Sequence, residues 1–216
     1  MTERNIPAQA LDAPAFHRNH EPIWSAIGPW LLRQSGHVFE AGSGTGQHVV
    51  TFARKSPNIT WWPSDHSEAY LGSIEAWRHN SGLPNIRPAR RIDLSAPDWG
   101  LNAEDSAALR DLTAIFCANV VHIAPWNVAE GLLGQAAARL KPDGRLYLYG
   151  PFMREGQHTA PSNAAFDASL RAQNPQWGVR DIADLASLAS VSGLMLAEIV
   201  PMPANNFMLI LERTGS

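Results

Sequence analysis

Apolar runs of strand length alternate with amphipathic segments of helical period along most of this 216-residue chain. The expected strands cover residues 37–42, 58–65, 85–94, 112–121 and 145–150, and the expected helices between them cover residues 46–56, 67–80, 102–110 and 126–140. The run "LTAIFCANVV" is apolar almost throughout, which is typical of a central strand buried on both faces. This alternation predicts a parallel sheet that is covered by helices on both faces.

The two ends of the chain depart from the alternation. Near the start, "EPIWSAIGPWLLRQSG" predicts a helix that begins at Pro22, after an N-terminal arm over residues 1–20. Near the end, "LMLAEIV" and "FMLILER" read as strands joined by "PMPANN", which is too short to contain a crossover helix. Strands joined so closely pair antiparallel. We therefore expect one α/β domain over residues 1–216, with a seven-stranded, mostly parallel sheet and a C-terminal antiparallel hairpin.

Composition narrows the classes of ligand. Hydrophobic residues make up 45% of the chain and charged residues 17%, which is typical of a globular domain. The formal net charge of −3 gives no electrostatic basis for binding nucleic acid. The lone cysteine, Cys117, excludes a disulfide framework and a cysteine-built zinc site, and no metal is expected. Because the start lacks a signal-peptide core and no run is long enough to span a bilayer, we expect a cytoplasmic protein with no membrane partner.

A glycine-rich loop follows the first expected strand, with the pattern E-x-G-x-G-x-G over Glu40, Gly42, Gly44 and Gly46. No lysine follows Gly46, so the loop is not a phosphate-binding loop of NTPases, and Gln47 stands where dinucleotide-binding loops carry their third glycine. The acidic Glu40 would repel a pyrophosphate, and it suits a ligand with cationic or donor groups. S-adenosylmethionine (SAM) has a sulfonium, an ammonium and no phosphate, so it is the predicted cofactor.

Further candidate cofactor residues follow the next strands. Asp65 ends the second strand, where a carboxylate would accept both ribose hydroxyls, and Asp93 and Leu94 end the third, where an adenine edge would lie. Asn119 follows the fourth strand. All of these positions are carboxyl ends of parallel strands, where open α/β sheets bind their ligands.

With these motifs in this order, the chain resembles the class I SAM-dependent methyltransferases, which have a Rossmann-like fold, over nearly its full length. It is also similar, from about Phe16 to Glu212, to a small family of methyltransferase-like proteins of bacteria and animals. The stretches RN-x-x-P-I, E-x-G-S-G-T-G-Q-H, C-A-N-x-x-H-I-A-P-W and M-P-A-N-N carry this likeness. The resemblance implies SAM as cofactor and S-adenosylhomocysteine as product, and it supplies no substrate. The expected cofactor-binding residues are Glu40, Gly42, Ser43, Gly44, Thr45, Gly46, His48, Asp65, Asp93, Leu94, Asn119, Arg18 and Asn19.

Two pairs of residues have competing interpretations. His122 and Asn119, after the fourth strand, are candidate catalytic residues, with His122 as general base for a hydroxyl, thiol or phenol. Alternatively, His122 packs or hydrogen-bonds under the loop. Arg18 and Asn19 precede the expected first helix and either hold the carboxylate of the cofactor or of the substrate, or provide a helix cap beside a solvated arginine.

A long connection, residues 151–180, follows the fifth strand and is expected to form a lid over the substrate pocket. Within it, "SNAAFDASLRAQ" predicts a helix with Phe166 and Leu170 on one side. The candidate substrate-binding residues are His122, Trp126, Phe152, Asn163, Asp167, Arg171, Trp177, Asn205 and Asn206. The sequence thus predicts a SAM-dependent methyltransferase that acts on a small molecule by direct displacement. The alternative is a protein of the same fold that binds cofactor or a partner and catalyses nothing.

Overall fold

A computed structural model describes residues 9–214 of the chain. The chain divides into two compact units, of which the first ends at Ile92 and the second begins at Asp93. The first eight residues of the expected arm lie outside the described residues. The single domain over residues 1–216 stays a prediction.

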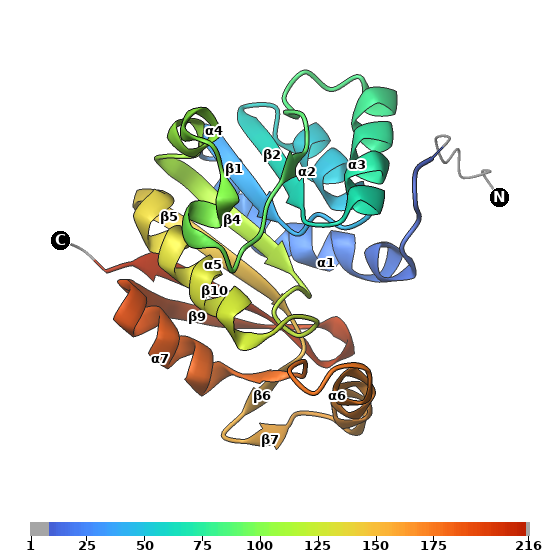
Figure 1. Ribbon diagram of the computed structural model, residues 1–216, viewed down its shortest axis with the longest axis vertical. Helices are drawn as coiled ribbons and strands as arrows, with labels where there is room; N and C mark the ends of the chain where they lie inside the picture. The colour runs from blue at the N-terminus through green and yellow to red at the C-terminus, as the bar shows by residue number, and fades with distance from the viewer. Residues whose placement is uncertain (1–8, 215–216) are drawn as a thin grey trace. The chain divides into compact units, whose positions relative to one another are not determined.

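The first unit contains three helices and three parallel strands among its described residues (Figure 1). These elements are α1 (Pro14–Leu31), β1 (Gly36–Ala41), α2 (Gln47–Lys55), β2 (Ile59–Asp65), α3 (Glu68–Ser81) and β3 (Arg90–Arg91). Strand β2 pairs in parallel with both β1 and β3. Val38, Phe39 and Trp61 are fully buried, so the centre of this unit is apolar, as the runs around 37–42 and 58–65 predict.

The second unit begins with the 3₁₀ helix η1 and ends with a hairpin (Figure 1). Its elements are η1 (Pro97–Gly100), α4 (Ala103–Ala108), β4 (Leu112–Ala118), α5 (Trp126–Arg139), β5 (Leu140–Gly150), β6 (Phe152–Arg154), β7 (Gln157–His158), α6 (Pro161–Gln173), β8 (Arg180–Asp181), α7 (Ile182–Ser192), β9 (Leu194–Met202), η2 (Pro203–Asn205) and β10 (Asn206–Arg213). Strand β4 is buried from Leu112 to Cys117, which agrees with its continuous apolar run.

The seven main strands form a mostly parallel sheet, to which the first unit contributes β3-β2-β1 and the second β4-β5-β10-β9. Strand β10 runs antiparallel to both of its neighbours, with Phe207 opposite Gly150 on β5 and Asn206 opposite Met202 on β9. Strand β10 runs in the reverse direction because the connection before Asn206 is too short to carry the chain back to the end of the sheet at which β9 begins. The predicted fold class, α/β and Rossmann-like with a C-terminal antiparallel hairpin, is therefore confirmed.

The first helix begins at Pro14, eight residues before the predicted start at Pro22. Pro22 and Pro29 lie inside the helix, although an internal proline removes a backbone hydrogen bond. Ile23, Ile27 and Leu31 are fully buried at spacings of four residues, and their burial offsets that loss. Arg18 and Asn19 thus lie within the helix and do not precede it, so the helix-cap interpretation of Asn19 is wrong.

The long connection after β5 contains the predicted helix, as α6, and also a small sheet that the sequence analysis did not foresee. In this sheet β6 pairs antiparallel with β7 and parallel with β8. Helix α6 buries Asn163, Asp167 and Leu170, whereas Phe166 is 40% exposed. The predicted helix is present, and Phe166 and Leu170 lie four positions apart along it, but only Leu170 is buried, because the polar side chains of Asn163 and Asp167 occupy the rest of the buried face.

Candidate functional site

The glycine-rich loop joins β1 to α2 in the first unit. Gly44 and Gly46 have φ values of 54° and 87°, in the left-handed region that side chains disfavour. A Cβ atom on Gly46 would lie 2.8 Å from the Cα of Ile74 on α3, whereas one on Gly44 would meet no atom within 4 Å. Gly46 is therefore required by conformation and by the close approach of α3, and the open space at Gly44 leaves room for a ligand beside the backbone.

Asp65, predicted to accept hydrogen bonds from the ribose hydroxyls, connects the end of β2 to this loop through hydrogen bonds. Its Oδ2 accepts a hydrogen bond from the Gly44 N–H at 3.0 Å, and its Oδ1 accepts one from the Ser67 N–H at 3.0 Å. The Ser43 N–H also donates to the Ser64 carbonyl oxygen at 2.7 Å. A carboxylate can accept about four hydrogen bonds, so Asp65 keeps capacity for ribose hydroxyls.

Glu40 is buried below the loop, and its Oε2 has no hydrogen-bond partner among residues 9–214. Burial raises the pKa of Glu40 to about 8; a hydrogen bond from Ser43 opposes this rise and the charge of Asp65 adds to it. A buried polar atom without a partner destabilises the fold by about 1–3 kcal/mol. The site therefore fits a ligand that brings a cationic or donor group, as SAM does.

Asn19 and His48, both expected near the cofactor, contact each other. Asn19 is buried on α1, and its Oδ1 lies 2.9 Å from the Nε2 of His48 on α2. Burial lowers the pKa of His48 to about 3, with His20 adding a smaller effect, so its ring is neutral at pH 7. Arg18, one position earlier, is exposed. Thr45 donates from its hydroxyl to Gln47, a residue that the sequence analysis did not select.

The second unit carries Asp93 and Leu94 shortly before η1. Asp93 is exposed, and its Oδ1 accepts hydrogen bonds from the Ser95 N–H at 2.9 Å and the Ser95 hydroxyl at 2.6 Å. Leu94 is buried. The carbonyl oxygen of Leu94 would lie 1.9 Å from a Cβ atom on Gly131 of α5, so this turn is packed directly against that helix.

His122 and Asn119 converge on the end of β5. A Cβ atom on Gly150 would lie 2.4 Å from the Nε2 of His122 and 3.2 Å from the Oδ1 of Asn119. The His122 ring also meets the Phe152 ring edge-on, with centroids 4.9 Å apart. The structure thus brings together three of the predicted site residues around a glycine.

The His122 side chain is fully buried, and neither ring nitrogen has a hydrogen-bond partner within the described part of the chain. Burial lowers the pKa of His122 to about 3; the charge of Arg180 adds to this effect, whereas the nearby backbone of Gly178 and the charge of Asp167 oppose it. The ring is therefore neutral at pH 7. A neutral imidazole has one nitrogen that can accept a proton, which is what a general base requires.

Residues 151–180 contact the loop after β4. The Gly178 N–H donates to the His122 carbonyl oxygen at 2.9 Å. Arg180 donates to the carbonyl oxygens of Val121 and Ala124 at 3.0 and 2.6 Å. This segment, which we call the insert, also reaches η2, where the Asn163 amide donates to the carbonyl oxygen of Asn205 at 2.9 Å.

Several of the candidate substrate residues are engaged with their own neighbours. Asp167 accepts from the Val179 N–H at 2.7 Å and from Arg171 Nε at 2.8 Å. The Asn206 amide donates to the Pro203 carbonyl oxygen at 3.1 Å. These bonds stabilise the insert and the turn before β10. Trp177 is half-buried, and its backbone N–H donates to the Asn174 carbonyl oxygen at 2.9 Å.

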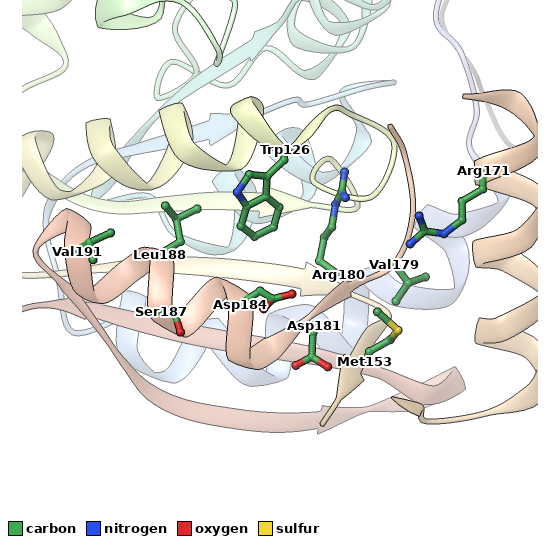
Figure 2. Close-up of a pocket in the computed structure, with 10 residues that line it drawn as sticks. All are labelled: Trp126, Met153, Arg171, Val179, Arg180, Asp181, Asp184, Ser187, Leu188 and Val191. Carbon is green, nitrogen blue, oxygen red and sulfur yellow. The ribbon is translucent and has the colours of Figure 1, made fainter. Parts of the chain in front are cut away.

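A pocket of about 610 Å³ lies where α5, α7 and the insert meet, as Figure 2 shows. Its lining residues are Trp126, Met153, Arg171, Val179, Arg180, Asp181, Asp184, Ser187, Leu188 and Val191. Two of them, Trp126 and Arg171, are predicted substrate-binding residues; the other seven candidates do not line it. The Arg180 guanidinium lies over the Trp126 ring, 5.6 Å from its centroid. Arg180 was not selected from the sequence because it stands at the boundary between the insert and the next helix.

Within residues 9–214, no group of three or more His, Cys, Asp or Glu side chains is arranged to hold a metal ion. In the same part of the chain, no helix combines the length and the apolar character needed to cross a membrane.

The fold is that of known methyltransferases. An O-methyltransferase family protein from Burkholderia thailandensis superposes with a TM-score of 0.75 and 17% sequence identity, covering 94% of this chain and 58% of its own. Human N-acetylserotonin methyltransferase, in complex with SAM, superposes with a TM-score of 0.73 and 15% identity, covering 94% of this chain and 53% of its own. The chain thus matches little more than half the length of these two proteins. At such identities the likeness defines the fold class and not the activity.

The particular family is defined by sequence. Residues 11–213 match the family described as "Protein of unknown function (DUF938)", and the chain belongs to that family.

Proposed function

We propose that this protein binds SAM and transfers its methyl group to a small-molecule acceptor. The observation that carries the proposal is Glu40, a buried carboxyl group with an Oε2 that has no partner among the described residues, beside a glycine-rich loop. SAM, when bound, supplies a methyl group on a sulfonium, which is activated for direct displacement. Glu40 would accept from the cationic or donor groups of the cofactor, and Asp65, already bonded to Gly44, would accept from its ribose hydroxyls.

His122 acts as the general base in this proposal. The acceptor is a hydroxyl, thiol or phenol whose proton passes to the unprotonated ring nitrogen of His122 while the acceptor atom is methylated. The depressed pKa of His122 keeps the closed ring neutral at pH 7. Because burial is the main cause of that depression, opening of the site to an acceptor would return the pKa toward the ordinary value near 6.5 and make the ring a stronger base. Asn119, which reaches the same side of Gly150, positions the acceptor. A correctly held acceptor supplies much of the rate enhancement of a displacement reaction.

The insert, residues 151–180, serves as the lid of this site. Its bonds from Gly178 and Arg180 to the loop around His122 hold the ring out of contact with solvent. An acceptor reaches His122 when these bonds open, and closure then excludes water from the reaction. Lids of this kind open and close on the microsecond to millisecond timescale.

A second candidate function is binding of SAM without methyl transfer. The complete burial of His122 favours it, because a base that no acceptor reaches performs no chemistry. The two functions share the cofactor site and differ only in turnover.

The test has two stages. Calorimetry with SAM and S-adenosylhomocysteine measures cofactor binding, and no binding of either ligand would refute both candidates. Label transfer from methyl-labelled SAM to a fractionated metabolite extract then measures turnover. His122→Asn should retain cofactor affinity within about twofold and lose label transfer about 10²- to 10⁴-fold. Binding without transfer to any fraction would leave the second candidate standing.

A further inference from the structure

The side chain of Gln47 connects the glycine-rich loop to residues 11–13, which precede α1. Its Oε1 accepts hydrogen bonds from the Ala13 N–H at 2.8 Å and the Thr45 hydroxyl at 2.9 Å. Its Nε2 donates to the Oδ1 of Asp12 at 2.7 Å. Gln47 is buried, so these bonds are shielded from water and replace its own hydration.

A second connection joins the same two segments through α3. The hydroxyl of Ser73, which is fully buried, accepts from the Leu11 N–H at 2.8 Å and donates to the Thr45 carbonyl oxygen at 2.8 Å. Trp77 Nε1 donates to the Leu11 carbonyl oxygen at 3.0 Å. Thr45 is therefore held at its hydroxyl by Gln47 and at its carbonyl by Ser73, and both of these residues also hold residues 11–13.

Thr45 needs such support because it stands between two flexible positions. Gly44 and Gly46 both adopt positive φ, and a glycine loses more conformational freedom on ordering than any other residue. The start of α2 offers no alternative, since its N-cap, Gly46, has no side chain to bond the first turn. The conformation of the loop thus depends on bonds from outside it.

We propose that residues 11–13, which we call the strap, fix the glycine-rich loop in its cofactor-binding conformation, with Gln47 as the positioning residue that couples the two. This inference rests on the proposed function, because the ligand whose binding it controls is SAM or its product. The role proposed for Gln47 is exerted through Thr45 and the strap, to which its side chain bonds. By linkage, cofactor bound to the loop must also stabilise the strap.

The test combines calorimetry with hydrogen–deuterium exchange, using S-adenosylhomocysteine as the probe. In the wild-type chain the ligand should slow exchange of the Leu11 and Ala13 amides, which donate to Ser73 and Gln47. Gln47→Ala should abolish that slowing and raise the Kd for the ligand about tenfold. Gln135→Ala is the matched control, since it also removes a glutamine that bonds within its unit, here to Arg139 at 3.1 Å, and it should leave the Kd within about twofold.

A pair of variants in the strap keeps the test decisive if Gln47→Ala fails to fold. Asp12→Asn retains an oxygen that can accept from Gln47, and it should bind the ligand within about twofold of wild type. Asp12→Ala removes that acceptor and should weaken binding several-fold. Equal affinities of Asp12→Ala and wild type, or ligand binding without slower exchange at Leu11 and Ala13, would overturn the proposal.

Failure of the proposed function is a separate outcome. If wild-type protein binds neither SAM nor S-adenosylhomocysteine, the methyltransferase proposal falls, and hydrogen exchange in the ligand-free protein then tests whether the strap fixes the loop. Gln47→Ala, or Asp12→Ala in its place, must then accelerate exchange of the amides of residues 42–46. Unchanged exchange of that loop would refute the strap as well.

Discussion

The imidazole of His122 lies directly against the α-carbon of Gly150, so close that a Cβ atom there would be 2.4 Å from Nε2. This contact joins the loop after β4 to the last residue of β5, and only glycine permits it. The candidate general base therefore owes its position to a residue with no functional group of its own. Gly150 is a position that sequence reasoning had no signal to select.

Gly150→Ala should displace the His122 ring and destabilise the protein. Overpacking a well-filled core costs about 1–3 kcal/mol, and the free energy of unfolding in urea should fall by that amount. The rate of methyl transfer should fall by more than the loss of folded protein explains, because His122, the candidate general base, is displaced. Gly134→Ala is the control: a Cβ atom there meets nothing within 4 Å, and alanine in a helix is expected to stabilise by up to about 1 kcal/mol. Equal stability of the two variants would contradict the close contact.

The depressed pKa of His122 predicts a pH-dependent contribution to stability. Its pKa is about 3 when folded and near 6.5 when unfolded, so between these values the unfolded chain binds more protons. The contribution is present above pH 6.5 and is lost as the pH falls toward 3, by up to about 1.4 kcal/mol per pH unit. Urea unfolding of wild type and His122→Asn from pH 7.5 to pH 4 measures it. The stability difference between them should shift in favour of the variant as pH falls, and a constant difference would refute the shift.

The raised pKa of Glu40 predicts a contribution to stability with the opposite pH dependence. Its pKa is about 8 when folded and near 4.5 when unfolded, so its contribution is present below pH 4.5 and is lost as the pH rises through 8. Glu40→Gln cannot ionise, and it should therefore gain stability relative to wild type as pH rises from 5 to 9, by up to about 1.4 kcal/mol per unit. At pH 9, where wild-type Glu40 is ionised, the same variant should bind SAM at least about tenfold more weakly, because it lacks the charge that faces a cationic ligand. A variant that matched wild type in both measurements would remove Glu40 from the site.

Asp65→Ala should weaken S-adenosylhomocysteine binding about tenfold to a hundredfold. Hydrogen bonds to charged groups contribute roughly 1.5–3 kcal/mol, and the ribose would lose such an acceptor. The Gly44 N–H would lose its partner too, which loosens the loop. Asp65→Asn keeps one acceptor oxygen and should show a smaller loss. Calorimetry on both variants checks the order, and unchanged affinity in a folded Asp65→Ala protein would mean that Asp65 does not face the cofactor.

Local pattern alone determined the class of fold and the position of the glycine-rich loop. The alternation of strand-like and helix-like segments dictates parallel pairing, because a helix between two strands carries the chain back to the end of the sheet at which the first strand began. Residues 201–206 are too few for such a return, so the antiparallel hairpin was predictable as well. Glu40, Gly46 and Asp65 could be selected as candidate site residues because their residue types and their positions at the ends of expected strands can be read directly from the sequence.

Only the tertiary structure decided which residues support those groups. Pro22 looked like a helix start, yet the burial of Ile23, Ile27 and Leu31 keeps the helix continuous from Pro14. The bond between Gln47 and Asp12 spans 35 positions, and the approach of Gly150 to His122 depends on the pairing of β4 with β5. Contacts of this kind leave no periodicity in the sequence, because each depends on packing between segments that are distant along the chain.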